Sequence, residues 1–172
     1  MKLSLIKSLV HSLARVSHIV NIFCWALAGA CLIVMLLAVG IQVTGRYLLF
    51  SAPSWTEELA RYAMVWAGLV GATVSFYERQ DPVIVNLPLP KSKGLNRLVE
   101  SVKAIPVLVF IAPLIYYSPL VITHHMDRLT ESLKITSAYV LLVVPIFAWI
   151  ILLHQSSRLL SAYLNDSASS QN

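Results

Sequence analysis

Four long apolar stretches constrain this chain more than any other feature of its sequence. They cover about residues 19–43, 56–77, 99–122 and 135–160, and short polar segments separate them. About 20 apolar residues cross the hydrocarbon core of a bilayer as an α-helix, in which backbone polar groups are bonded internally. The sequence therefore predicts an all-α integral membrane protein, with four transmembrane helices in one domain over residues 1–164.

The composition argues against a soluble fold and against a nucleic-acid partner. Of the 172 residues, 58% are hydrophobic and only 12% are charged, which is far from the usage of soluble domains. The net charge is +5, but the basic residues flank the apolar stretches, as orientation signals do, and are not interleaved with aromatic residues. Membrane lipids and other membrane proteins are the expected surroundings.

The two ends of the chain differ in character. In residues 2–18 apolar side chains return at helical spacing, as at Leu5, Leu9 and Leu13, which predicts an amphipathic helix lying in the membrane interface. We expect this end to be retained, because the first apolar stretch, at 25 residues, is too long for a cleaved signal. Residues 165–172 are small and polar, and they are predicted to be disordered.

The second apolar stretch begins and continues with recognisable helix signals. Ser54 and Glu57 have capping-box spacing, so a helix is predicted to start near Trp55, which would anchor it in the interface. Small residues then recur at every fourth position: Ala63, Ala67, Gly71 and Ser75. Such a face lets another helix backbone approach closely, and we interpret it as a packing surface or a partner interface.

Prolines interrupt the second half of the chain. Pro82, Pro88 and Pro90 predict an irregular loop between the second and third helices. Three more lie inside the third helix, and Pro145 lies near the centre of the fourth. The third helix is expected to bend, with its freed carbonyl groups bonded by neighbouring helices.

Lysine and arginine predict the orientation of the four helices. Nine of them would lie on one side, namely Lys2, Lys7, Arg15, Arg79, Lys91, Lys93, Arg97, Lys103 and Arg158. Four would lie on the other, namely Arg46, Arg61, Arg128 and Lys134. The side richer in cations faces the cytoplasm, so both termini are predicted to be cytoplasmic.

Charged residues of both signs gather around the start of the second helix. Glu57 and Glu58 lie four and three residues before Arg61, so both carboxylates can reach its guanidinium on one helix. Arg46, at the end of the first helix, could reach the same carboxylates across a short loop. The sequence predicts a structural ion-pair network of these four residues. The alternative is separate exposed pairs, each worth about 0.2–1 kcal/mol or nothing.

Catalytic and cofactor signatures do not stand out. There is no nucleophile elbow, no glycine-rich phosphate loop and no zinc spacing of Cys or His, so we expect neither an enzyme nor a cofactor. Cys24 and Cys31 lie two turns apart on one helix, too far for a disulfide. The histidines, such as His18 and His154, are interpreted as lying at helix ends. A membrane anchor that holds haem for a respiratory enzyme remains the alternative function.

The spanning stretches also lack the charged groups of a solute pathway. Arg61 is the exception, and it lies about one turn inside its helix. A transporter acting alone needs polar groups or broken helices at mid-membrane depth. The chain is therefore interpreted as a helper to another membrane protein.

Four segments resemble one known family. Arg46 and Tyr47 end the first helix, and Trp55–Tyr62 then reads Trp-Thr-Glu-Glu-Leu-Ala-Arg-Tyr. Val65–Ala72 adds an aromatic and Gly-Ala stretch, and Glu131–Ile135 precedes a helix with a central proline. These motifs resemble the small membrane subunit of tripartite ATP-independent periplasmic (TRAP) transporters. One departure is Arg79-Gln80-Asp81-Pro82, where family members commonly have a basic residue followed by Gly and His.

The resemblance implies a non-catalytic subunit of a sodium-coupled importer in the bacterial inner membrane. In such a transporter a periplasmic binding protein captures an organic acid, such as a C4-dicarboxylate or a sialic acid, and a large multi-spanning subunit moves it inward. The small subunit is expected to scaffold the large one and to help dock the binding protein.

Overall fold

The computed structural model describes residues 2–48, 50–51, 53–78 and 93–168, and the side chains within 10–161 apart from 49, 52 and 79–101. The described residues form five helices: α1 (Lys2–Leu48), α2 (Ser54–Glu78), α3 (Lys93–His124), α4 (Ser137–Leu141) and α5 (Val143–Ala168). Four stretches are long and apolar enough to cross a membrane, with α4 and α5 contributing jointly to the last. The predicted all-α fold with four spans is confirmed.

The first helix is longer than the sequence analysis expected. α1 runs without interruption for 47 residues, so the interfacial helix predicted over 2–18 does not stand as a separate element. No Gly or Pro lies between residues 2 and 18 to break it. Its apolar part, Val10–Leu48, has 39 residues. At 1.5 Å per residue this is about 58 Å, against a hydrocarbon core of about 30 Å, so α1 must tilt strongly or project from it.

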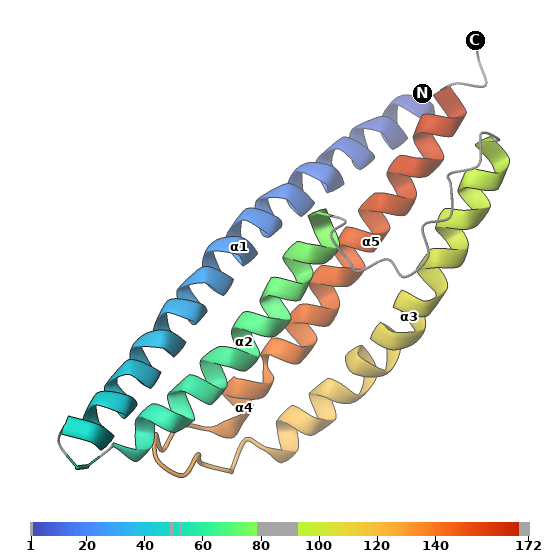
Figure 1. Cartoon of the computed structure of the whole chain (residues 1–172). Helices are drawn as coiled ribbons and strands as arrows, with labels where there is room; N and C mark the ends of the chain where they lie inside the picture. Colours follow the sequence, from blue (N-terminus) through green and yellow to red (C-terminus); the bar gives the residue numbers. More distant parts are fainter. Residues whose placement is uncertain (1, 49, 52, 79–92, 169–172) are drawn as a thin grey trace.

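The helices form an elongated array of long rods (Figure 1). α1 pairs with α2, α3 pairs with α5, and α5 also contacts both α1 and α2. The α1–α2 turn and the α3–α4 loop lie at one end of the array, here called the loop end. The chain termini lie at the opposite end, here called the terminal end, where α1 and α5 extend beyond the last turn of α2.

A seam of small residues joins α1 to α2. Six of the buried residues of α2 alternate four and three apart, namely Thr56, Ala60, Ala63, Ala67, Val70 and Val74. On α1 nine of the buried and half-buried positions follow the same alternation, namely Ser17, Asn21, Cys24, Ala28, Cys31, Met35, Ala38, Gln42 and Gly45. This is the period of a left-handed helix pair, and small side chains let the two backbones approach.

Pro145 and Pro119 each remove a backbone hydrogen bond from their own helix. Pro145 lacks an N–H to bond the carbonyl of Leu141, and α4 ends at Leu141 while α5 starts at Val143. Pro119 frees the carbonyl of Ile115 in the same way, and the Ser118 hydroxyl of α3 itself donates to this carbonyl at 3.5 Å. The carbonyl of Ile115 is therefore bonded within α3, whereas a partner from a neighbouring helix was expected.

The remaining boundaries differ modestly from expectation. α3 already includes residues 93–97, which had been assigned to the loop, and the predicted loop prolines at 82, 88 and 90 lie outside the described residues. The 79–82 departure from the family pattern lies outside them as well. α5 continues to Ala168, so helix replaces the first part of the predicted disordered tail, and residues 169–172 are not described.

Candidate functional site

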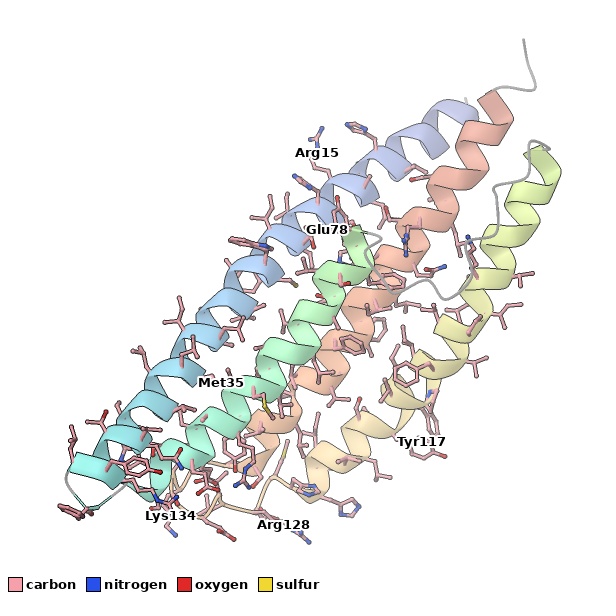
Figure 2. All side chains as sticks on the ribbon, viewed as in Figure 1. Arg15, Met35, Glu78, Tyr117, Arg128 and Lys134 are labelled. Carbon is pink, nitrogen blue, oxygen red and sulfur yellow. The ribbon has the colours of Figure 1, made fainter. Side chains whose placement is uncertain are left out.

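The loop end of the bundle brings together two motifs that are far apart in the sequence. One is the charged start of α2, and the other is the α3–α4 loop, residues 125–136, which carries Arg128 and Lys134 at this end (Figure 2). The contact between them depends mainly on a single side chain of α2.

The Glu58 carboxylate holds the α3–α4 loop. Its Oε2 accepts the backbone N–H groups of Ser132 and Leu133, both at 2.8 Å. Its Oε1 accepts the backbone N–H of Glu131 at 3.2 Å and the hydroxyl of Tyr62 at 2.6 Å. Successive backbone N–H groups that point at one anion form a nest, and hydrogen bonds to an ionised acceptor are the stronger kind. We call this arrangement the Glu58 clamp.

The loop is shaped to present those N–H groups. Thr130 donates its N–H to the carbonyl of Ile135 at 2.8 Å, and its hydroxyl oxygen accepts the Ile135 N–H at 3.1 Å. Ser137 donates its N–H to the carbonyl of Arg128 at 2.8 Å. Lys134 turns the chain in the left-handed region, with φ of 55°. These backbone hydrogen bonds form between residues at the two sides of the loop. The N–H groups of residues 131–133, at its tip, therefore remain available to the carboxylate.

The predicted four-residue ion-pair network is only partly assembled. Arg61 and Glu57 form a salt bridge at 2.9 Å on adjacent turns of α2, with both side chains more than 60% exposed. Glu58 faces the loop instead of Arg61, and no salt bridge joins Arg46 to either carboxylate. The sequence pattern located the right residues but assigned Glu58 to the wrong partner.

We expect Arg61→Ala to have a small effect on the stability of the subunit. The pair is exposed, and an i,i+4 pair on a helix surface is worth about 0.3–0.5 kcal/mol. Unfolding of the purified subunit in detergent, followed by circular dichroism, measures the change. A loss above about 1 kcal/mol would show that Arg61 has a further partner.

The hydrogen bonds at the start of α2 are not those of the predicted capping box. The helix begins at Ser54, and the Thr56 hydroxyl donates to the carbonyl of Pro53 at 2.6 Å. Glu57, the expected capping-box partner, accepts from Arg61. Trp55 lies on this first turn and is 40% exposed, a position open to an interfacial role.

The small-residue face of α2 divides into two halves. Ala63 and Ala67 are buried within the chain, at 8% and 7% exposure. Gly71 and Ser75 are only half-buried, and a Cβ built on Gly71 would meet nothing within 4 Å. The first half is therefore used for packing inside the subunit, while the second half has room beside it.

A buried polar group at the terminal end was missed by the sequence analysis. His154 is 1% exposed, and its Nδ1 lies 2.7 Å from the Ser17 hydroxyl oxygen of α1. Its ring packs against Tyr77 of α2, with centroids 5.1 Å apart. His154 lies inside α5 and not at a helix end, because the helix continues well past the end of the apolar run. The sequence did contain a signal for this buried site. Ala148 and Ile151 are buried three residues apart, and the polar run His154–Ser157 begins at the next position with that spacing.

Two hollows between the described helices have mostly apolar linings. One is lined by Phe76 of α2, Phe110 and Ile111 of α3, and Phe147 and Ile151 of α5. The other lies between α3 and the α4–α5 segment. Over the described residues, no three His, Cys, Asp or Glu side chains gather as metal ligands would. His18 and His154 both meet the ring of Tyr77, which does not match two imidazoles facing across a haem.

These features define the class of protein to which the chain belongs. The chain is a four-span helical membrane protein whose charges tie helices together at one end and whose hollows are apolar. The model of one protein family matches residues 35–165, and its description is "Tripartite ATP-independent periplasmic transporters, DctQ component". The match covers most of the chain, so the chain belongs to this family of small membrane subunits of TRAP transporters. No curated protein matches the chain as a relative.

Membership confirms the resemblance that the motifs indicated. The family match includes both segments that the Glu58 clamp joins, the start of α2 and the α3–α4 loop. A component of a tripartite transporter works with partners of two kinds, a large membrane subunit and a periplasmic binding protein.

Proposed function

We propose that this chain is the non-catalytic small subunit of a sodium-coupled TRAP importer for organic acids of the C4-dicarboxylate or sialic acid class. In this proposal a periplasmic binding protein delivers the acid, and a large membrane subunit moves it inward with sodium. The chain scaffolds the large subunit in the bacterial inner membrane and helps to dock the binding protein. Its termini face the cytoplasm, and the loop end faces the periplasm.

The apolar lining of the hollows is the observation that carries the proposal. The hollow beside Phe76 is lined by hydrocarbon and aromatic side chains, and the other adds only the hydroxyls of Tyr117 and Ser118 to such a lining. Neither hollow presents a cation to a carboxylate, which is costly to bury without a charged partner. The charged side chains at the loop end are used in the clamp or lie exposed at the surface. A chain of this kind supports a transport pathway that another subunit provides.

The loop end is the surface that we assign to docking. Glu57, Glu58 and Arg61 act there as structural residues, and Arg46 lies at the end of α1 as an exposed cation beside them. Because the clamp holds the α3–α4 loop in one conformation, its exposed side chains form a surface that does not need to be ordered on binding.

Reconstitution of transport tests this proposal directly. The large subunit is purified with and without this chain, placed in liposomes, and supplied with its binding protein, a labelled organic acid and a sodium gradient. We expect uptake only with this chain present and only with sodium outside. Uptake by the large subunit alone at the same rate would remove the scaffold role, and uptake without sodium would remove the coupling.

The second half of the small-residue face predicts where the large subunit packs. Gly71→Leu fills the open space beside Gly71, so we expect normal folding of the isolated subunit and a several-fold lower yield of the large subunit in co-purification. Gly40→Leu is the matched control, since Gly40 is an exposed glycine on α1 with equally open space. Equal yields from the two variants would contradict an interface at Gly71.

A further inference from the structure

The polar junction at the terminal end is the point where α1, α2 and α5 meet through side chains. His154 of α5 contacts Ser17 of α1 and Tyr77 of α2. The Tyr77 hydroxyl also lies 3.3 Å from Nδ1 of His18, which links α1 to α2 directly. One turn further along α5, the guanidinium of Arg158 lies 4.6 Å from the ring centroid of Phe76. Two successive turns of α5 therefore rest on the aromatic end of α2.

The junction is built for a neutral imidazole. His154 Nδ1 has the Ser17 hydroxyl as its partner, while Nε2 is buried and has no hydrogen-bond partner among the described residues. Asn21, one turn along the α1 seam from Ser17, likewise has a buried Oδ1 without a partner. A neutral ring with one unmet nitrogen costs far less in such a place than a cation would, because a buried charge needs a partner of opposite sign.

The groups that face His154 do not offer that partner. Its ring and nitrogen contacts are a hydroxyl and a phenol. Among the described residues, the other charged or titratable side chains toward this end of the helices are Arg15 and His18 of α1, Glu78 at the exposed end of α2, Lys103 of α3, and Arg158 of α5. Arg158, one turn away on the same helix, has the same sign as a protonated imidazole. No described hydrogen bond or salt bridge joins His154 to Glu78.

We propose that His154 is a proton-binding site, and that proton uptake there loosens α5 from α1 and α2 at the terminal end of the bundle. A second proton on the ring makes a cation beside Arg158, and the contacts that the described residues give the ring, Ser17 and Tyr77, are neutral. The loop end has its own attachment in the Glu58 clamp, and the apolar cluster of Cys24, Val70, Val74 and Val143 lies between that end and the junction. The opening is therefore local, and it does not depend on the transport role proposed above.

The charge of the His154 imidazole decides whether the junction opens in acid or in alkali. Histidine gains its proton as the medium is acidified through about pH 6.5 and below. The closed junction belongs to the neutral form, so it is present at neutral and alkaline pH and is lost as the pH falls.

Amide hydrogen exchange of the complete subunit in lipid nanodiscs tests this inference. Rates at about pH 7.5 and about pH 5, corrected for the intrinsic pH dependence of exchange, are compared for the α1 and α5 segments around residues 17 and 154. We expect several-fold faster corrected exchange in acid for these segments, with residues 131–133 of the loop end unchanged as an internal reference. An unchanged rate at the terminal end would overturn the proposal.

Two variants separate His154 from other titrating groups. His154→Gln retains a hydrogen-bonding group for Ser17 but takes up no proton, so its corrected exchange should be the same at both pH values. His18→Gln removes the exposed imidazole that contacts Tyr77 within the same junction, and the acid response should persist in this variant because His154 is retained. An acid response in His154→Gln as large as that of the wild type would overturn the assignment.

A direct measurement on the wild-type protein covers the case in which His154→Gln does not fold. Nitrogen-15 spectra of histidine-labelled subunit should show one imidazole that passes from a neutral tautomer to the doubly protonated form together with the change in exchange. If His154 remains neutral throughout while the terminal end opens, the proposal is wrong.

Discussion

Glu58→Gln is expected to release the α3–α4 loop while the helices remain intact. The carboxylate supplies two charged oxygen atoms to three backbone N–H groups and the Tyr62 hydroxyl. A glutamine amide supplies one neutral carbonyl oxygen, and its NH₂ group would face N–H groups that need an acceptor. Amide exchange at residues 131–133 should therefore become much faster, and Glu58→Ala should accelerate it further.

Glu57→Gln is the matched control for this substitution. Glu57 is the neighbouring residue, is also a glutamate, and accepts only from the exposed Arg61. Its replacement should leave exchange in the loop unchanged. If both variants release the loop equally, net charge at the start of α2 matters and the specific hydrogen bonds do not. In the reconstituted transporter, Glu58→Gln should also lower uptake if the loop docks the binding protein as proposed.

The sequence analysis identified Glu58 but not its role, and the reason is physical. Helix spacing relates residues three or four apart, so it found the bridge between Glu57 and Arg61. Of the four partners of Glu58, the Tyr62 hydroxyl lies four residues on, but the other three are backbone N–H groups 73 to 75 residues further along the chain. Every residue except proline carries such a group, so the side-chain sequence does not record which of them face an anion.

The helices themselves were predictable because their signal is local. Length and hydropathy alone locate four spans, since the bilayer requires internally bonded helices of a certain length. The continuity of α1 was harder to foresee. An amphipathic pattern in residues 2–18 is compatible with a helix on a membrane surface and with a helix packed along α5. Tertiary contacts such as Ser17 with His154 decide between the two.

The small-residue face of α2 shows a similar limit. A strict period of four fits Ala63, Ala67, Gly71 and Ser75, but two helices that wind around each other meet at alternating spacings of four and three. The contact seam therefore follows Ala63 and Ala67 and then passes to Val70 and Val74, away from Gly71. The small-residue face and the seam coincide at Ala63 and Ala67, and they diverge from Val70 onward.

Ala63→Leu is expected to destabilise the subunit itself. Ala63 is 8% exposed on the seam between α1 and α2, where small residues line both helices. Three added carbon atoms must push the helix backbones apart or take up strained rotamers, at a cost of about 1–3 kcal/mol. The loss also removes close packing that drives helix association in lipid, where burial of apolar surface adds little. Reversible unfolding in mixed detergent micelles measures the change.

Ala30→Leu provides the control for added size and helix propensity, because Ala30 is exposed on α1. Its effect should stay within about 0.5 kcal/mol. The comparison with Gly71→Leu then assigns the two halves of the small-residue face. Ala63→Leu should lower the stability of the isolated subunit, whereas Gly71→Leu should leave it unchanged and act only when the large subunit is present. If Ala63→Leu is as stable as the wild type, α1 and α2 have room between them, and the seam does not hold the pair together by close packing.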